Sequence, residues 1–334
     1  MRILITGGAG FIGSHFVRTL LGGGYPAFTG AQVTVLDKLT YAGNLANLGS
    51  VDGQYTFAKA DIADPFALDD LVAGHDLVVN FAAETHVDRS ITGAADFVVT
   101  NVLGTQTLLD ACLRHGVRRL LHVSTDEVYG SIEHGSWTEA HPLEPNSPYS
   151  AAKAGADLLA LAYGRTYGLD VVVTRCSNNY GPFQFPEKLI PLFVTNLIDG
   201  LPVPLYGDGG NVRDWLHVDD HGRGIALALE HGNPGEVYNI GGGSELTNRE
   251  LTERLLALCG RDWSAVRPVA DRLGHDRRYS VDCGKLAALG YAPATDFVEG
   301  LAKTVDWYRA NEPWWRPLKA AHTPVAVTPT VASV

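Results

Sequence analysis

The sequence has little of what a nucleic-acid-binding or membrane protein normally needs. Its 334 residues carry a formal net charge of −11, whereas nucleic-acid binding normally requires a basic surface. No uninterrupted apolar run reaches the roughly 20 residues that a membrane-spanning helix needs. The chain starts directly with a strand-like segment, MRILITGG, which leaves no room for a signal peptide. We therefore expect a cytoplasmic protein without a nucleic-acid or membrane partner.

Cysteine is scarce, and its four residues are scattered at Cys112, Cys176, Cys259 and Cys283. They form no CxxC pair and stand at no metal-ligand spacing with histidine. We therefore expect reduced thiols and no bound metal, with a catalytic cysteine as the less favoured alternative. Apolar residues make up 46% of the chain and charged residues 19%, which is typical of a soluble globular protein. The length suits one large domain or two modest ones.

The first half of the chain alternates short apolar runs with helical patterns. Most of the runs are continuously apolar, as in strands that are covered on both faces. A helix between them is predicted over 64–74, with Asp64 as its N-cap and Pro65 at its first position. This alternation predicts an α/β fold with a Rossmann-type, doubly wound parallel sheet. The predicted strands lie at 2–7, 33–37, 55–61, 77–83, 119–125 and 170–178.

The composition changes after Asn178, where loops rich in Pro, Gly and aromatic residues begin. We expect a dinucleotide-binding domain over 1–178, to which a later part, about 214–240, returns. A smaller, mainly C-terminal substrate-binding domain is expected over 179–316, and the tail 320–334 is expected to be disordered. The predicted later helices lie at about 218–232, 247–259 and 297–311; the second begins with a capping box of Thr247 and Glu250.

Two longer helices are predicted, over about 95–115 and 148–167. Much of their apolar surface must pack on the sheet. A second, exposed apolar stripe would suit helix-to-helix association, although the sequence does not separate the two stripes. We expect a homodimer formed through these helices.

The segment TGGAGFIG, residues 6–13, joins the first predicted strand to the first helix. Gly7, Gly10 and Gly13 allow a sharp turn and close approach to a pyrophosphate, to which the helix N-terminus presents amide donors. The alternative is a tight turn without a ligand. Asp37 ends the next strand, where a carboxylate can bind ribose hydroxyls and repel a 2′-phosphate. The pattern therefore favours NAD; Lys38 weakens that preference slightly.

The segment STDEVYG, residues 124–130, ends a buried strand with a hydroxyl and two adjacent carboxylates. Further on, YSAAK places Tyr149 and Lys153 four residues apart on one face of a helix. An ammonium beside a phenol favours the phenolate and is expected to lower the pKa of Tyr149. Taken by themselves, these groups could be solvated loop acids and a solvated helix face. Beside a dinucleotide loop, we interpret both segments as catalytic.

Five segments together carry a more specific resemblance. They are AAETHVDRSI, STDEVYG, SNNYGPFQFPEKLIP, GNVRDWLHV and GHDRRY. With the glycine loop and the YxxxK pair, they make the chain resemble the extended short-chain dehydrogenase/reductase family of nucleotide-sugar enzymes, up to about residue 316. The resemblance implies NAD as cofactor and dTDP-glucose as substrate. It also implies oxidation of the sugar at C4, loss of water across C5 and C6, and return of the hydride to C6.

The resemblance assigns roles to particular residues. Thr125 would bond the sugar hydroxyl together with Tyr149, Asp126 would protonate the leaving hydroxyl, and Glu127 would take the C5 proton. The sequence alone does not order the two carboxylates. A raised pKa of Asp126 is expected, because the group is buried and lies near Glu127.

The remaining assignments concern binding. Cofactor contacts are implied for Gly7, Gly10, Phe11, Ile12, Gly13, Asp37, Lys38, Leu39, Thr40, Asp61, Ile62, Phe81, Ala82, Ala83, Thr100, Tyr149, Lys153 and Asn178. Substrate contacts are implied for Thr85, Asn179, Glu187, Lys188, Leu189, Pro204, Tyr206, Arg213, Asn248, Arg272 and His275.

Several of these residues have a simpler explanation. Arg213 could form a surface ion pair with Asp214, Asn248 could merely begin a helix, His275 could be a loop histidine, and Thr85 could be an N-cap. Two other functions are also compatible with the pattern. A UDP-sugar 4-epimerase or UDP-glucuronate decarboxylase would share NAD, Tyr149 and Lys153, but an epimerase has no hydroxyl for Asp126 to expel. A non-catalytic NAD-binding regulator would usually lack Tyr149 or Lys153.

Overall fold

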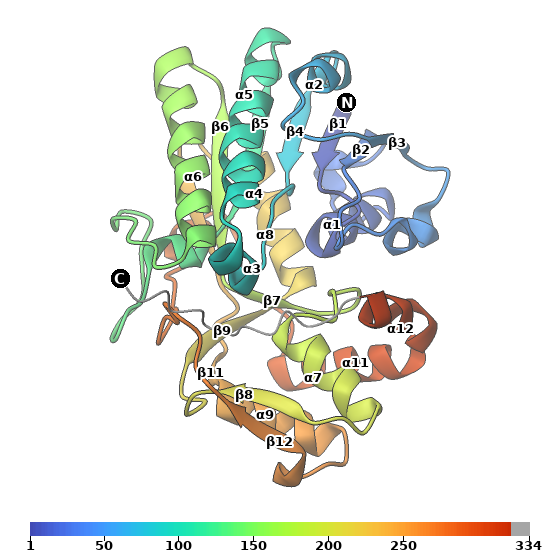
Figure 1. Cartoon of the computed structure of the whole chain (residues 1–334). Coiled ribbons are helices and arrows are strands. Elements are labelled where there is room, and N and C mark those ends of the chain that lie inside the picture. The colour runs from blue at the N-terminus through green and yellow to red at the C-terminus, as the bar shows by residue number, and fades with distance from the viewer. Residues whose placement is uncertain (322–334) are drawn as a thin grey trace.

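The computed structural model describes residues 1–321 and builds them around one large parallel sheet, in the upper half of Figure 1. Its seven strands run in the order β10-β6-β5-β4-β1-β2-β3, and every neighbouring pair is parallel. The strand order changes direction between β1 and β4, which is where doubly wound sheets bind ligands. The strands are β1 (Arg2–Thr6), β2 (Gln32–Asp37), β3 (Thr56–Lys59), β4 (Leu77–Asn80), β5 (Arg119–Thr125), β6 (Val171–Cys176) and β10 (Val237–Ile240).

Both faces of this sheet are covered by helices, which explains the continuously apolar strands. In β1, Ile3 and Ile5 pack into one apolar core, and Leu4 packs into another on the opposite face. The first core receives side chains from α1 (Phe11–Leu21), α8 (Val218–His231) and α10 (Gly284–Ala287). The second receives side chains from α2 (Pro65–Val72), α5 (Thr105–Arg114) and α6 (Pro148–Tyr167).

A smaller domain lies below the carboxyl ends of the large sheet's strands in Figure 1. It contains a sheet of β7 (Asn178–Tyr180), β9 (Val212–His217) and β11 (Glu245–Thr247), and a pair of β8 (Val203–Tyr206) with β12 (Val266–Val269). Its helices are α7 (Leu189–Ile198), α9 (Asn248–Leu258), α11 (Phe297–Ala310) and α12 (Glu312–Ala321). Between β9 and β11 the chain returns to the larger domain, because α8 packs on β5 and β6, and β10 pairs with β6.

The α/β class and the Rossmann-type parallel sheet are confirmed. All six predicted strands are present, and α6 has the predicted bounds of 148–167. The helix expected over 64–74 is α2, in which Asp64 caps the N-terminus and accepts from two backbone N–H groups. Strand β10 and the short helix α3 (Val87–Thr92) were not predicted from the sequence.

The uninterrupted helix predicted over 95–115 is wrong in its middle. The structure has α4 (Ala95–Phe97), a wider π-helical segment η3 (Val98–Gly104), and then α5. Within η3, the amide of Asn101 accepts from the backbone N–H of Glu84 at 2.9 Å and donates to its C=O at 3.0 Å. The wider turns therefore accompany a side-chain attachment to the segment after β4. Such π-helical turns often occur beside functional sites.

The C-terminus also differs from the prediction. Helix α12 extends to Ala321, so residues 320 and 321 are helical, and the rest of the predicted disordered tail, 322–334, lies outside the described residues. Helix α12 was not predicted from the sequence. Pro313 stands in its first turn, where the missing N–H costs nothing, and Pro317 lies inside it. The described residues also include short 3-10 helices: η1 (Pro26–Phe28), η2 (Leu45–Val51), η4 (Asp126–Tyr129) and η5 (Trp263–Ala265). Within residues 1–321, no helix has the length and apolar character needed to cross a membrane.

Candidate active site

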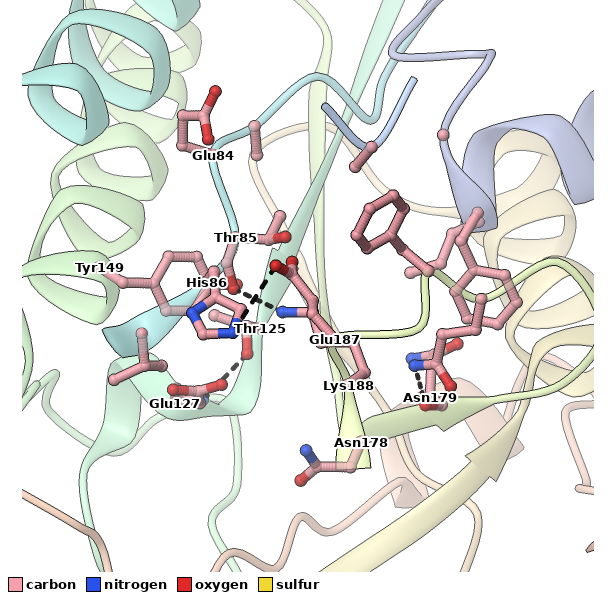
Figure 2. Close-up of a pocket in the computed structure, with 18 of the residues that line it drawn as sticks. Glu84, Thr85, His86, Thr125, Glu127, Tyr149, Asn178, Asn179, Glu187 and Lys188 are labelled. Carbon is pink, nitrogen blue, oxygen red and sulfur yellow. Dashed lines mark hydrogen bonds and ion pairs between the residues drawn. The ribbon is translucent and has the colours of Figure 1, made fainter. Parts of the chain in front are cut away.

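A cavity of ≈ 440 Å³ lies between the carboxyl ends of the large sheet's strands and the small domain. Its walls come from the segments after β1, β2, β4 and β5, from α6, and from the small domain. Figure 2 shows Thr125, Glu127 and Tyr149 on one side, with Glu187 and Lys188 extending toward them from the other. The cavity brings together both predicted sets of binding residues, with Leu39 as the exception.

The glycine loop forms the end of the cavity near β1. Gly7 has a left-handed φ of +67°, and a Cβ there would lie 2.6 Å from the backbone N of Ala82. A Cβ on Gly13 would collide with the carbonyl oxygen of Gly7. Gly10 precedes α1, whose N-terminus has no side-chain cap. The glycines thus leave space for a pyrophosphate, and the N-terminus of α1 presents amide donors to it, as binding of a dinucleotide requires.

Asp37 ends β2 and is 8% exposed. Its carboxylate accepts from the backbone N–H of Ala9 at 2.9 Å and of Leu39 at 2.8 Å. Burial raises the pKa of Asp37, and the two N–H donors partly oppose this rise. Leu39 does not line the cavity; its contribution is the N–H that orients Asp37.

Lys38 is paired within the protein rather than directed at a ligand. Its Nζ lies 2.6 Å from Oδ2 of Asp61 at the end of the third strand. Burial alone would raise the pKa of Asp61, but Lys38 and the N–H of Ala63 lower it below its usual value. Because this pair offsets the positive charge of Lys38, the site does not present an uncompensated cation for a 2′-phosphate.

Thr125, Asp126 and Glu127 form the wall at the end of β5. The Thr125 hydroxyl accepts from the Glu127 N–H at 3.3 Å and lies 3.3 Å from Oδ1 of Asp126. Thr125 therefore caps η4, so the following two carboxylates enter the cavity from one tight turn. Asp126 is 2% exposed, and its Oδ2 has no hydrogen-bond partner among the described residues.

The two carboxylates have different electrostatic surroundings. Burial raises the pKa of Asp126 well above its usual value, and the neighbouring Glu127 and Asp214 raise it further. Burial also raises the pKa of Glu127, but Arg213, Lys188 and other cations oppose that rise. The expected raised pKa of Asp126 is confirmed in direction. The surroundings thus favour a protonated Asp126 and leave Glu127 better able to ionise.

Tyr149 and Lys153 lie on α6, with exposures of 7% and 3%. Lys153 Nζ donates to the carbonyl of Val123 at 2.7 Å. The prediction that the pKa of Tyr149 is lowered is wrong for the protein alone. Burial raises it well above its usual value, and the negative charge of Glu127 adds to the effect. Ionisation of this phenol therefore requires more positive charge than the protein places around it.

Glu187 and Lys188 form the opposite wall. Lys188 Nζ donates to the carbonyl of Thr85 at 2.9 Å, and Glu187 accepts from the hydroxyl of Tyr41 at 2.9 Å. Burial lowers the pKa of Lys188, whereas Glu187 and Glu127 oppose this change. Thr85 lines the cavity but caps no helix; the N-cap of α3 is the next residue, His86.

Four further predicted residues surround the small-domain end, next to Pro204 and Tyr206 of β8. Arg213 donates to the carbonyls of Val212 at 2.7 Å and Asp276 at 3.0 Å. Its expected alternative pairing with Asp214 is absent from the described residues, since Asp214 accepts from backbone N–H groups.

Arg272 pairs with Asp88 at 3.0 Å, and its guanidinium lies 5.1 Å from the ring centre of Tyr206. His275 bonds Asp271 at 2.6 Å. Asn248 begins α9 and is 6% exposed, and its Oδ1 has no partner among the described residues. An unpartnered buried amide oxygen at the cavity favours a ligand contact over a purely structural role.

Asn178 and Asn179 follow β6 and have different roles. The amide of Asn179 is held by protein groups, because it donates to the carbonyl of Ser177 at 2.9 Å and contacts His221 at 2.8 Å. Asn178 also lines the cavity, and its buried Oδ1 has no partner within the described chain. Asn178 is therefore the freer of the two to bind a ligand.

Sequence reasoning missed several cavity residues, among them Glu84 and His86. His86 Nε2 lies 3.8 Å from Oε2 of Glu187, so it joins the two walls. Both residues flank Thr85 in the AAETHVDRSI segment, which could have indicated them. Cys176 also lines the cavity, but burial raises the pKa of its thiol to about 12. A thiol that resists ionisation is poorly suited to nucleophilic catalysis.

Comparison with known proteins agrees with this geometry. A model of the family described as GDP-mannose 4,6 dehydratase matches residues 4–304. The dTDP-glucose 4,6-dehydratase of Streptomyces antibioticus is 65% identical over 96% of this chain and 96% of its own. The crystal structure of DesIV, a dTDP-glucose 4,6-dehydratase from Streptomyces venezuelae with NAD and TYD bound, has a TM-score of 0.94 and 64% identity, covering 95% of this chain and all of that one.

More distant structures share the fold with a different reaction. The UDP-glucose 4-epimerase of Thermus thermophilus, solved with NAD, is 35% identical with a TM-score of 0.86, over 93% of this chain and 100% of its own. The family match spans most of the chain, and identity is much higher to the dehydratases than to this epimerase. The chain therefore belongs to the GDP-mannose 4,6 dehydratase family and, within it, to the group of dTDP-glucose 4,6-dehydratases, which are hydro-lyases.

Proposed function

We propose that this protein converts dTDP-glucose into dTDP-4-keto-6-deoxyglucose for deoxysugar biosynthesis, with NAD as its resident cofactor. The observation that carries the proposal is the pair of carboxylates at the end of β5. Asp126 is surrounded by groups that keep it protonated, and Glu127 is surrounded by cations, in the same cavity as Tyr149 and Lys153. An acid and a base side by side are what elimination of water requires.

NAD fits the end of the cavity formed by the glycine loop. The space above Gly7 and Gly13 suits its pyrophosphate, and Asp37 suits the ribose hydroxyls. When bound, NAD takes up the hydride from C4 and returns it to C6, so that it is not consumed. Thr100 of η3 and Asn178 line the same cavity and complete its wall.

Oxidation at C4 requires a base for the sugar hydroxyl. Tyr149 is that base, with Thr125 oriented to bond the same hydroxyl. The pKa of Tyr149 is raised by burial and by Glu127, so the phenolate forms only with added positive charge nearby. The cationic ring of the oxidised cofactor would supply that charge, next to Lys153 on the same face of α6. The base therefore becomes active when the cofactor is in its oxidised state.

Elimination follows from the 4-keto group, which makes the proton at C5 removable. Glu127 takes this proton, and Asp126 donates a proton to the C6 hydroxyl, which leaves as water. When the hydride is returned to C6, the protonated Glu127 gives a proton to C5, which completes the 6-deoxy sugar. The family resemblance gives this order of roles. The surroundings support it, because burial and two nearby carboxylates keep Asp126 protonated while Arg213 and Lys188 favour ionised Glu127.

The nucleoside diphosphate lies at the small-domain end of the cavity. Arg213 and Arg272 supply guanidinium groups that match phosphate oxygens, and Asn248 adds an amide at the start of α9. Tyr206 and Pro204 of β8 provide apolar surface for the base. Glu187 and Lys188 contact the sugar from the opposite wall.

One isotope experiment tests the proposal. With dTDP-glucose deuterated at C4, the label is expected at C6 of the same molecule, and solvent deuterium is expected at C5 in heavy water. Activity should need no added NAD, because the cofactor is regenerated in each turnover. Mass spectrometry of a mixture of labelled and unlabelled substrate gives the readout. Return of the label to C4 would instead identify a 4-epimerase, and label crossover between molecules would refute the closed cycle.

We also propose that the protein works as a cytoplasmic homodimer. Large apolar side chains are exposed on η3 and α6, two segments that pack together: Val98 (52% exposed), Val99 (45%), Leu103 (48%) and Leu158 (59%). Their burial in a second copy would remove apolar surface from water. All four cysteines are free, as suits a reducing compartment.

A charge in this surface should separate the two copies. Leu158→Glu is expected to give a monomer in size-exclusion chromatography with light scattering, because it would bury an unpaired carboxylate at the interface. Val298→Glu is the matched control, since Val298 is 56% exposed and belongs to α11 of the small domain, whereas η3 and α6 belong to the larger domain. A Leu158→Glu protein of wild-type mass would place the interface elsewhere.

A further inference from the structure

Helix α12 is anchored to the small domain. The indole of Trp315 is fully buried in the small-domain core and donates to the carbonyl of Tyr308 at 2.8 Å. Arg316 and Lys319 pair with Asp199 at the end of α7, at 2.9 and 2.7 Å. The position of α12 is thus determined by α7 and α11, at the edge of the small domain nearest α1 (Figure 1).

From this helix, Trp314 reaches across to the larger domain. Its Nε1 donates to Oδ1 of Asn47 in η2 at 2.9 Å. Asn47 is 2% exposed, and its Nδ2 donates in turn to the carbonyl of Ala9 at 2.9 Å. Because the amide oxygen is engaged by Trp314, the amide nitrogen is turned toward Ala9. A contact from the C-terminal helix therefore sets the orientation of the Asn47 side chain.

Ala9 is the central residue of the glycine loop, between Gly7 and Gly10. Its carbonyl accepts from Asn47 Nδ2 and from the backbone N–H of Asn44 at 3.0 Å, and its own N–H donates to Asp37 at 2.9 Å. Both peptide groups of Ala9 are thus held by groups outside the loop. The loop's remaining N–H groups can bind a pyrophosphate only if the loop keeps this conformation.

A second contact joins the same elements. Phe183 has a left-handed φ of +68°, which a bulky residue adopts only when its surroundings hold it. Its ring lies 4.6 Å from that of Trp307 and 5.5 Å from that of Trp314, and the Arg18 guanidinium lies 4.4 Å from its centre. Arg18 belongs to α1 and also donates to the carbonyl of Asn47.

We propose that Trp314 and Asn47 are positioning residues for the glycine loop, and that α12 thereby controls how tightly NAD is retained. The inference rests on the proposed use of NAD but not on the dehydration chemistry. Neither residue lines the cavity. They act by holding Ala9, so their loss should speed NAD release while the chemistry of the NAD-saturated enzyme changes little.

The test compares two tryptophans of one aromatic cluster. Trp314→Phe keeps an aromatic ring but removes the N–H that bonds Asn47. Trp307→Phe makes the same chemical change at a neighbour of Phe183 that does not bond Asn47. NAD dissociation from the holoenzyme is measured by displacement with excess labelled NAD. For Trp314→Phe we expect NAD release about 3- to 10-fold faster than from the wild type, which is the rate change that corresponds to the free energy of one hydrogen bond. For Trp307→Phe we expect NAD release close to the wild-type rate.

A double-mutant cycle makes the test specific. Asn47→Leu removes both side-chain bonds, so adding Trp314→Phe to it should cause no further acceleration. Wild-type NAD release from Trp314→Phe would overturn the proposal, as would equal effects of both tryptophan variants or additive effects in the cycle. Because displacement of NAD is read without substrate, this outcome is independent of whether the protein dehydrates dTDP-glucose.

Discussion

Asp126→Asn is expected to stop the loss of water while C4 oxidation continues. The amide keeps the size and burial of the side chain but cannot give an acidic proton to the C6 hydroxyl. General acid catalysis typically contributes about 10²–10⁴-fold, so dehydration should slow by that factor. Reduced cofactor and a 4-keto hexose should then accumulate, measured by nicotinamide absorbance and mass spectrometry. A variant that dehydrates at the wild-type rate would remove Asp126 from the mechanism.

The pH dependence gives this experiment its internal control. Asp126 must be protonated to act, so wild-type dehydration should fall as pH rises through its raised folded pKa, and this limb should vanish in the variant. Stability follows the same sign. Between the usual pKa of an aspartate, 3.8, and the raised pKa of Asp126 in the folded protein, the unfolded chain has released this proton while the folded protein still holds it. The free energy of unfolding of the wild type therefore falls as pH rises through this range, by up to about 1.4 kcal/mol per pH unit.

Asparagine does not titrate in this range. The melting temperature of Asp126→Asn, relative to that of the wild type, should therefore increase as pH rises. The expected variant is folded and stable but inactive. Asp219→Asn serves as the matched control, because the Asp219 side chain is 59% exposed and lies outside the cavity lining. That change should leave dehydration near the wild-type rate.

Tyr149→Phe is expected to block the reaction before any hydride moves. Removal of the phenol leaves no base for the C4 hydroxyl, while the ring keeps its edge contact with Phe97 at 6.2 Å. A positioned base is worth about 10²–10⁴-fold, so cofactor reduction should slow by that factor. In contrast to Asp126→Asn, neither reduced cofactor nor 4-keto sugar should appear in a single-turnover experiment.

The matched control is Tyr167→Phe, since Tyr167 ends the same helix and is 57% exposed. It should oxidise and dehydrate substrate normally. If Tyr149→Phe still reduced its cofactor at the wild-type rate, another group would have to be the base. Bound NAD should be retained by both variants, so loss of cofactor cannot account for the difference.

Local sequence patterns were sufficient to predict many of the strands and helices, because these features depend on residues that are neighbours in the chain. Continuous apolar runs indicated strands covered on both faces, and Ile3, Leu4 and Ile5 do pack into cores on both sides of the sheet. Capping and proline placement identified α2 through Asp64 and Pro65. The same local reasoning failed at η3, where the helix widens as Asn101 bonds the backbone of Glu84, a contact 17 residues distant in the chain.

The sequence by itself determined which residue types could perform the chemistry, because the glycine loop, YSAAK and STDEVYG are short segments whose spacing has direct chemical meaning. Only the tertiary structure decided how those groups are charged. Burial and the negative charge of Glu127, which is close in space but not in sequence, raise the pKa of Tyr149, where an ammonium four residues away had suggested the opposite. Likewise, the bond from Trp314 to Asn47 joins residues 267 positions apart. Electrostatic surroundings and such long-range contacts depend on distances in space, which spacing along a chain does not give.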